Sequence, residues 1–207
     1  RTGGEGMAGV SLLIVEAGTA GFTRSPLQKM GWWASDTATL YFDNARVPVE
    51  NLIGPENQGF MAIMLNFNNE RLMLAAQAYA FAKVCYDESL AYARERQTFG
   101  KPLIRNQVIR HKLVDMRTRV EAVKANLDLM AWRIGHKHMP VAEVCMLKNF
   151  ATTSLEYVAN EAMQVFGGAG YLRGSKVERI YRETKVLTIG GGSLEIMKDL
   201  AARQMGL

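Results

Sequence analysis

One acidic residue in this sequence is placed where it could act as a general base. Glu70 stands among apolar neighbours in residues 66–74 (NFNNERLML) and is followed directly by Arg71. In an apolar cleft, desolvation would raise the pKa of the Glu70 carboxyl group toward working pH and suit it to proton abstraction. A glutamate at the solvent boundary of a core helix, paired with the next arginine, explains the same residues without chemistry. The pattern alone leaves both interpretations open.

Basic residues gather in residues 94–112, which begin RERQTFGK. Arginine forks bind phosphate, a glycine permits close approach, and an exposed phenylalanine could stack on a base, so the stretch could hold a pyrophosphate and an adenine. A solvated helix end with cations near its last carbonyls is the alternative, and composition alone favours it.

Two glycine clusters follow, GGAG at residues 167–170 and GGG at residues 190–192. The first ends a long helical pattern instead of following a strand, which argues against a Rossmann fingerprint and indicates a helix end. The second separates a short β-like run, residues 186–189, from a final helix that we expect to be capped by Ser193. Backbone amides could approach a ligand there, at a helix N-terminus, and a flexible loop is the alternative.

The elements that position these residues change in kind near residue 56. Residues 10–15 (VSLLIV) and 37–42 (TATLYF) carry strand signals, and Pro48 limits the next stretch to an edge strand or a loop. From residue 60 onward, apolar side chains recur at helical spacing.

Two prolines, Pro102 and Pro140, break this helical pattern into long helices that end near His138 and Phe166. Long helices joined by short turns usually lie antiparallel in a bundle. We therefore predict an α+β fold in which residues 1–55, the end of a β domain, precede an all-α four-helix-bundle domain, residues 56–207.

Composition excludes several classes of function. The 207 residues are 48% hydrophobic, enough to bury a core, yet contain no apolar run of about 18 residues, so we predict no membrane span. The two cysteines and three histidines match no metal-ligand spacing, and we predict no metal site. A net charge of +5 suits polyanionic small molecules as well as nucleic acid. Because the chain opens with RTGG in what reads as the middle of a sheet, we expect it to be a piece of a longer protein.

The segments RQTFGK (residues 96–101), QVFGGAGY (164–171) and TIGGGS (188–193), in this order, resemble the carboxyl-terminal half of the acyl-coenzyme A dehydrogenase family. The similarity extends over essentially all 207 residues, since KMGWWASDT (29–37) is similar to the family's middle domain. The resemblance implies an FAD-dependent flavoprotein oxidoreductase of fatty acid β-oxidation, which converts an acyl-CoA to a trans-2-enoyl-CoA.

The resemblance also implies roles for individual residues. Glu70 would remove the α proton while hydride passes to flavin N5, and the backbone N–H of Gly191 would polarise the thioester carbonyl. Many relatives carry the base at the position of Gly191, whereas long-chain and isovaleryl-type members carry it within Glu-Arg-Leu, which residues 70–72 match. The substrate would contact Asn68, Arg71 and Gly192. The flavin nucleotide would contact Arg96, Thr98 and Phe99 of a neighbouring subunit, joined by Gln107, Gln164, Gly168, Ser193 and Glu195.

The partners implied by the resemblance are an acyl-CoA substrate, an electron-transfer flavoprotein and further copies of the chain in a homodimer or homotetramer. The compartment would be the bacterial cytoplasm or the mitochondrial matrix. Two alternatives share the fold: an oxidase or flavin monooxygenase that reoxidises with dioxygen, and a non-catalytic DNA-binding relative. We predict no nucleic-acid partner, because nucleotide phosphates explain the basic cluster at residues 94–112 better.

Overall fold

The computed structural model describes residues 1–207, which divide into two compact units, residues 1–67 and residues 68–207. The division falls inside helix α1 (Gly59–Glu95), which begins in the first unit and continues through the second. A domain boundary between residues 55 and 56 stays a prediction.

The first unit contains two short antiparallel ladders. Strand β1 (Leu12–Leu13) pairs with β4 (Leu52–Ile53), and β2 (Phe22–Pro26) pairs with β3 (Ala38–Phe42). The rings of Phe22 and Phe42 face each other across the second ladder with centroids 4.9 Å apart. The strand predicted over residues 10–15 is confined to two residues, and β2 was not predicted, because its sequence (FTRSP) lacks an apolar alternation.

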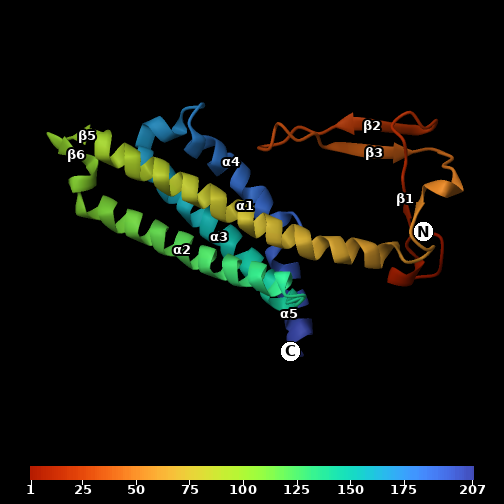
Figure 1. Cartoon of the computed structure of the whole chain (residues 1–207). Helices are drawn as coiled ribbons and strands as arrows, with labels where there is room; N and C mark the ends of the chain where they lie inside the picture. Colours follow the sequence, from red (N-terminus) through yellow and green to blue (C-terminus); the bar gives the residue numbers. More distant parts are fainter. The chain divides into compact units, whose positions relative to one another are not determined.

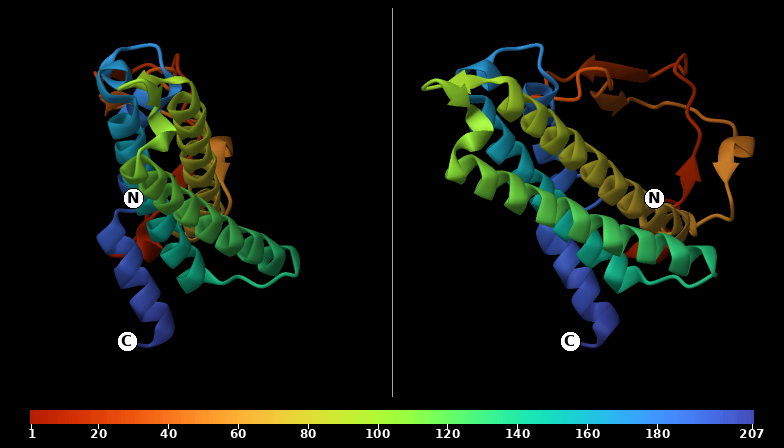
Figure 2. Two further views of the ribbon diagram at one scale, coloured as in Figure 1. Left: turned by 90° about the vertical axis from the view of Figure 1, so that its left-hand side faces the viewer. Right: turned by 60° about the vertical axis from the view of Figure 1, so that its left-hand side comes forward.

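The second unit is a helical bundle of the remainder of α1 with α2 (Gln107–Gly135), α3 (Val141–Phe166), α4 (Lys176–Ile189) and α5 (Leu194–Met205). Figure 1 shows α1, α2 and α3 running alongside one another, and the further views in Figure 2 agree. Helix α3 packs against α2, α4 and α5, which makes it the centre of the core. The predicted fold class, a helical bundle preceded by β structure, is confirmed.

The connection between α1 and α2 begins with a tight hairpin and ends with a short 3-10 turn, Leu103–Arg105. Strand β5 (Gln97–Thr98) pairs with β6 (Lys101–Pro102), and Phe99 and Gly100 between them have φ of 51° and 76°. Positive φ at both central residues is the geometry of a two-residue turn whose twist matches the strands it joins. The hairpin therefore presents Phe99 at its tip, fully exposed.

Residues 186–189, expected to be β-like, instead form the last turn of α4. Their side chains (Val-Leu-Thr-Ile) favour strands by propensity, yet Leu187 and Thr188 are buried in the helical core. The hydroxyl of Ser175 caps the N-terminus of α4 by accepting from the N–H of Glu178 at 3.0 Å. Burial and capping together override the local preference.

The structure contains no helix long and apolar enough to cross a membrane.

Candidate functional site

The loop of residues 190–193 joins α4 to α5 and has a backbone that requires glycine. Gly191 and Gly192 have φ of 67° and 114°, values that side-chain-bearing residues rarely adopt. A Cβ atom at Gly191 would lie 2.7 Å from Cδ1 of Leu74, and one at Gly192 would lie 2.4 Å from Cε of Met197. The glycines therefore permit both the turn and its close approach to α1 and α5.

Three side chains bind the carbonyl oxygens of this loop and of the helix that follows. Nε of Arg71, on α1, donates to the Gly191 oxygen at 3.1 Å. Nζ of Lys148, on α3, donates to the Gly192 oxygen at 2.6 Å. Nδ2 of Asn149 donates to the oxygen of Leu194 at 2.9 Å. The loop is thus held from two helices, while Oδ1 of Asn149 is buried without a hydrogen-bond partner.

Both cations at this loop are removed from solvent. Arg71 is 4% exposed and also donates to Oδ1 of Asn68 at 3.2 Å, so it joins Asn68 to the glycine loop. Lys148 is completely buried, and this burial, with the neighbouring Arg71 charge, lowers the pKa of its ammonium group. Two desolvated positive charges make the surroundings of the loop favourable for negative charge.

Glu70 lies in the same turn of α1 as Arg71 and Asn68 and is half-buried. Arg71 therefore contacts two other predicted residues, Asn68 and Gly191, and Gly192 follows Gly191 in the same loop. Glu70 lies beside Arg71 in the sequence. Its role as the base stays a prediction.

Ser193 and Glu195 begin α5. The hydroxyl of Ser193 caps the helix by accepting from the N–H of Ile196 at 3.4 Å, as predicted. The backbone N–H of Glu195 and the hydroxyl of Ser193 hold the pKa of the exposed Glu195 carboxyl group below its ordinary value. The lowered pKa makes the Glu195 carboxylate a weaker base than an ordinary glutamate.

A second group of predicted residues lies at the hairpin. Arg96 is exposed at the end of α1, Thr98 and Phe99 lie on the hairpin, and Gln107 is exposed at the start of α2. The oxygen Oγ1 of Thr98 is buried and has no hydrogen-bond partner. A buried hydroxyl without a partner costs stability, so Thr98 offers an unused donor and acceptor at this position.

Gln164 and Gly168 belong to the same end of the bundle as the hairpin. The rings of Tyr92 on α1 and Phe166 on α3 stack at 4.3 Å, which joins the last turns of the two helices. Both Gln164 and Gly168 are exposed, and no atom stands within 4 Å of a Cβ built at Gly168.

The hairpin group and the glycine loop are not brought together within one chain. Arg71 and Tyr92 are 21 positions apart on one continuous helix, which corresponds to about 30 Å of rise. A single chain therefore carries two separate groups of candidate site residues, one at each of these positions along α1.

Lys148 and Asn149 were missed by the sequence analysis. The available signal was periodicity: Val144, Lys148, Ala151 and Leu155 recur at helical spacing, and all four are buried. A lysine in a buried stripe requires an explanation, because charged side chains are almost never fully buried unless they are paired.

The hairpin residues fit a flavin nucleotide. The guanidinium group of Arg96 offers paired N–H donors for phosphate. Thr98 offers a buried hydroxyl without a partner, and Phe99 offers an exposed ring. FAD carries a pyrophosphate, hydroxyl groups and an adenine, which match these three features in kind.

Residues 57–206 match the family model described as acyl-CoA dehydrogenase, C-terminal domain. The chain is 37% identical to acyl-CoA dehydrogenase AFT10-1 of Alternaria alternata, covering 99% of this chain and 50% of that protein. It is 36% identical to the mitochondrial long-chain specific acyl-CoA dehydrogenase of Rattus norvegicus, covering 95% of this chain and 46% of the enzyme.

Among solved structures, a Mycobacterium smegmatis protein assigned to the acyl-CoA dehydrogenases superposes with a TM-score of 0.97. The two are 46% identical, over 100% of this chain and 55% of the other. The chain spans about half the length of the relatives that it matches.

Proposed function

The chain belongs to the acyl-CoA dehydrogenase family of FAD-dependent oxidoreductases, and we propose that it forms the carboxyl-terminal part of an enzyme that oxidises an acyl-CoA thioester to its trans-2-enoyl product, with Glu70 as the base. The observation that carries this proposal is the contact of Arg71, the residue after Glu70, with the carbonyl of Gly191 at 3.1 Å. This contact ties the turn of α1 that bears the proposed base to the glycine loop.

The proposed chemistry begins with the acidity of the α C–H bond beside a thioester carbonyl. That bond is weakly acidic, so donors must stabilise the negative charge that develops on the carbonyl oxygen as the proton leaves. The backbone N–H of Gly191 is the proposed donor, and the desolvated charges of Arg71 and Lys148 favour negative charge nearby. FAD, when bound, supplies the acceptor for the hydride from the β carbon.

Glu70 is proposed to accept the α proton. It stands on a helix whose position is fixed by Arg71, so its carboxylate is held on a rigid element. An acid at position 191 would have to adopt a φ of 67° and push Cδ1 of Leu74 aside, because a Cβ atom there would lie 2.7 Å from it. The sequence Glu70-Arg71-Leu72 and the similarity to long-chain specific enzymes support a long or branched acyl chain.

The hairpin is proposed to bind FAD held mainly by another copy of the chain. The separation of about 30 Å along α1 supports this arrangement, since a hairpin so far from the glycine loop is well placed to serve a different active site. The proposal includes a homodimer or homotetramer, an electron-transfer flavoprotein as acceptor, and a bacterial cytoplasmic or mitochondrial matrix location.

The test compares Glu70→Gln with Glu195→Gln in the complete gene product loaded with FAD. We expect both variants to retain the flavin absorbance spectrum. Anaerobic addition of butyryl-, isovaleryl- or palmitoyl-CoA should bleach the flavin of Glu195→Gln but not that of Glu70→Gln. Full bleaching in Glu70→Gln together with its loss in Glu195→Gln would refute the assignment of the base. Rapid oxygen consumption during turnover would identify an oxidase instead.

A further inference from the structure

Lys148 is a lysine whose ammonium group is completely buried and donates to a backbone carbonyl, that of Gly192, at 2.6 Å. Burying an ammonium group is costly, and replacement of buried charges by well-packed apolar residues is often neutral or stabilising. The residues around it on the buried face of α3, Val144, Ala151 and Leu155, are apolar. Core packing alone therefore does not account for a lysine at this position.

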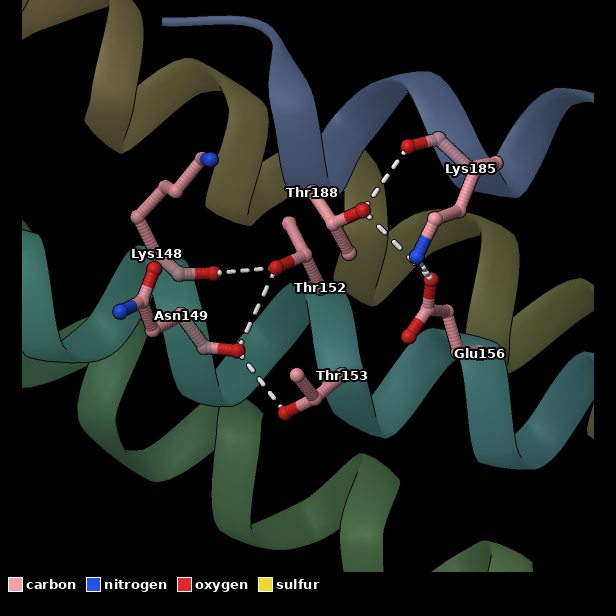
Figure 3. A network of polar contacts seen from close by, with 7 residues as sticks. All are labelled: Lys148, Asn149, Thr152, Thr153, Glu156, Lys185 and Thr188. Atoms are coloured by element: carbon pink, nitrogen blue, oxygen red, sulfur yellow. Dashed lines mark hydrogen bonds and ion pairs between the residues drawn. The ribbon is translucent and has the colours of Figure 1, made fainter. Parts of the chain in front are cut away.

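The backbone carbonyl of Lys148 has a side-chain partner of its own, separate from that of its ammonium group. The hydroxyl of Thr152 donates to the carbonyl oxygens of Lys148 at 2.9 Å and Asn149 at 3.3 Å. Figure 3 shows the Lys148 side chain extending away from the hydroxyl of Thr152, which binds the carbonyl of Lys148 and not its ammonium group. The lysine side chain thus rises from α3 and ends on the glycine loop.

The contacts at the loop determine the orientation of its peptide groups. Arg71 binds the Gly191 oxygen and Lys148 binds the Gly192 oxygen, from two different helices. In a trans peptide, the C=O of one residue and the N–H of the next point in opposite directions. Fixing these two oxygens therefore directs the N–H groups of Gly192 and Ser193 away from the two cations, and restrains the rotation of a segment that glycine would otherwise leave loose.

We propose that Lys148 is a positioning residue that, through the carbonyl of Gly192, restrains the glycine loop, so that the adjoining N–H of Gly191, the proposed donor, stays aligned with the thioester carbonyl of the substrate. This inference rests on the proposed function. Lys148 itself does not touch the substrate. Its contribution is to hold the peptide that follows Gly191, so that the Gly191 N–H keeps the orientation that the developing oxyanion requires. Asn149 extends the same restraint to the first turn of α5.

The experiment compares Lys148→Met, which keeps the volume but removes the charge, with Lys148→Arg and with Lys83→Met as a matched control. Lys83 is half-exposed on α1 and pairs with Asp87 at 2.5 Å. Amide hydrogen exchange is measured without substrate, and anaerobic flavin bleaching is measured against palmitoyl-CoA concentration in the FAD-loaded gene product.

In Lys148→Met we expect exchange to accelerate about 10-fold in peptides covering residues 189–197, with peptides of α2 unchanged. The limiting bleaching rate should fall by about 10- to 100-fold, because small displacements of positioned groups cost that much, while the apparent dissociation constant of palmitoyl-CoA changes by less than about 3-fold. Lys148→Arg should recover part of the rate, and Lys83→Met should match the wild type.

The proposal is overturned if Lys148→Met shows the amide exchange and the bleaching rate of the wild type. It is also overturned if exchange rises uniformly across all helices and the bleaching rate falls equally in Lys148→Met and Lys148→Arg. If Lys148→Met does not fold, Lys148→Gln decides, since it keeps a donor but not the charge or the reach; a wild-type bleaching rate there overturns the proposal. Failure of the proposed function would look different: the wild-type flavin would not bleach at all, while the exchange result would still stand.

Discussion

Substitution of Gly191 by alanine tests the two reasons that this position requires glycine, its positive φ and its close contact with α1. The φ of 67° at this residue lies in the left-handed region, where a Cβ costs about 1–2 kcal/mol. The new Cβ would also lie 2.7 Å from Cδ1 of Leu74, at the end of a flexible side chain. Displacing that methyl group in a packed environment adds about 1 kcal/mol. Gly191→Ala should therefore reduce the free energy of unfolding by about 2–3 kcal/mol.

The assay is urea unfolding followed by circular dichroism, with Gly135→Ala as the matched control. Gly135 has no positive φ, and no atom lies within 4 Å of its built Cβ. The control should be neutral or slightly stabilising, by up to about 1 kcal/mol. For a slope of about 2 kcal/mol per M, Gly191→Ala should lower the midpoint by about 1–1.5 M relative to the wild type.

A double-mutant cycle separates the two contributions. If the overlap with Leu74 contributes, Gly191→Ala should cost about 1 kcal/mol less in a Leu74→Ala background. The remaining loss measures the strain at φ. Equal stability of Gly191→Ala and Gly135→Ala would refute the reasoning on both counts.

The same overlap predicts the outcome of moving the acid. Introducing Gly191→Glu into the Glu70→Gln variant should restore flavin bleaching only at a reduced rate, because the new residue must adopt a positive φ and displace Leu74. Restored bleaching at the wild-type rate would show that position 191 accommodates a base.

Three further outcomes are expected. The ion pair of Glu178 with Arg182 holds the pKa of the nearly buried Glu178 carboxyl group below its ordinary value. The ion pair stabilises the fold fully above the ordinary pKa of a glutamate, and this stabilisation is lost as the pH falls toward the lowered pKa of Glu178. Glu178→Gln should therefore reduce the free energy of unfolding by about 1–3 kcal/mol at pH 7 and flatten the acid limb of a stability–pH curve. Thr98→Val removes a buried hydroxyl without a partner and should stabilise the FAD-free chain by about 1 kcal/mol while weakening FAD retention on gel filtration; loss of both stability and FAD would contradict this. Burial raises the pKa of the Cys85 thiol to about 12 and also raises the pKa of Cys145, so neither should react with a thiol reagent at pH 8 until urea unfolds the chain.

The sequence alone determined the helical architecture and the cap of the last helix. Long runs of apolar residues at three-to-four spacing, broken at Pro102 and Pro140, specify α1 to α3 almost without reference to their neighbours. Ser193 before an acidic turn specifies the start of α5 for an equally local reason, since a side-chain hydroxyl satisfies an otherwise unpaired N–H group. Such features depend on residues within one or two turns.

Only the tertiary structure decided how the glycine loop is held. Residues 186–189 carry strand-forming side chains, and their burial against α3 made them the last turn of α4. Arg71 and Gly191 are 120 positions apart, and Lys148 and Gly192 are 44 apart, so no local pattern could pair them. A carbonyl of a glycine has no signature in sequence, because every residue has one. Which carbonyl a buried cation binds is decided by the packing of α1, α3 and α5 around the loop.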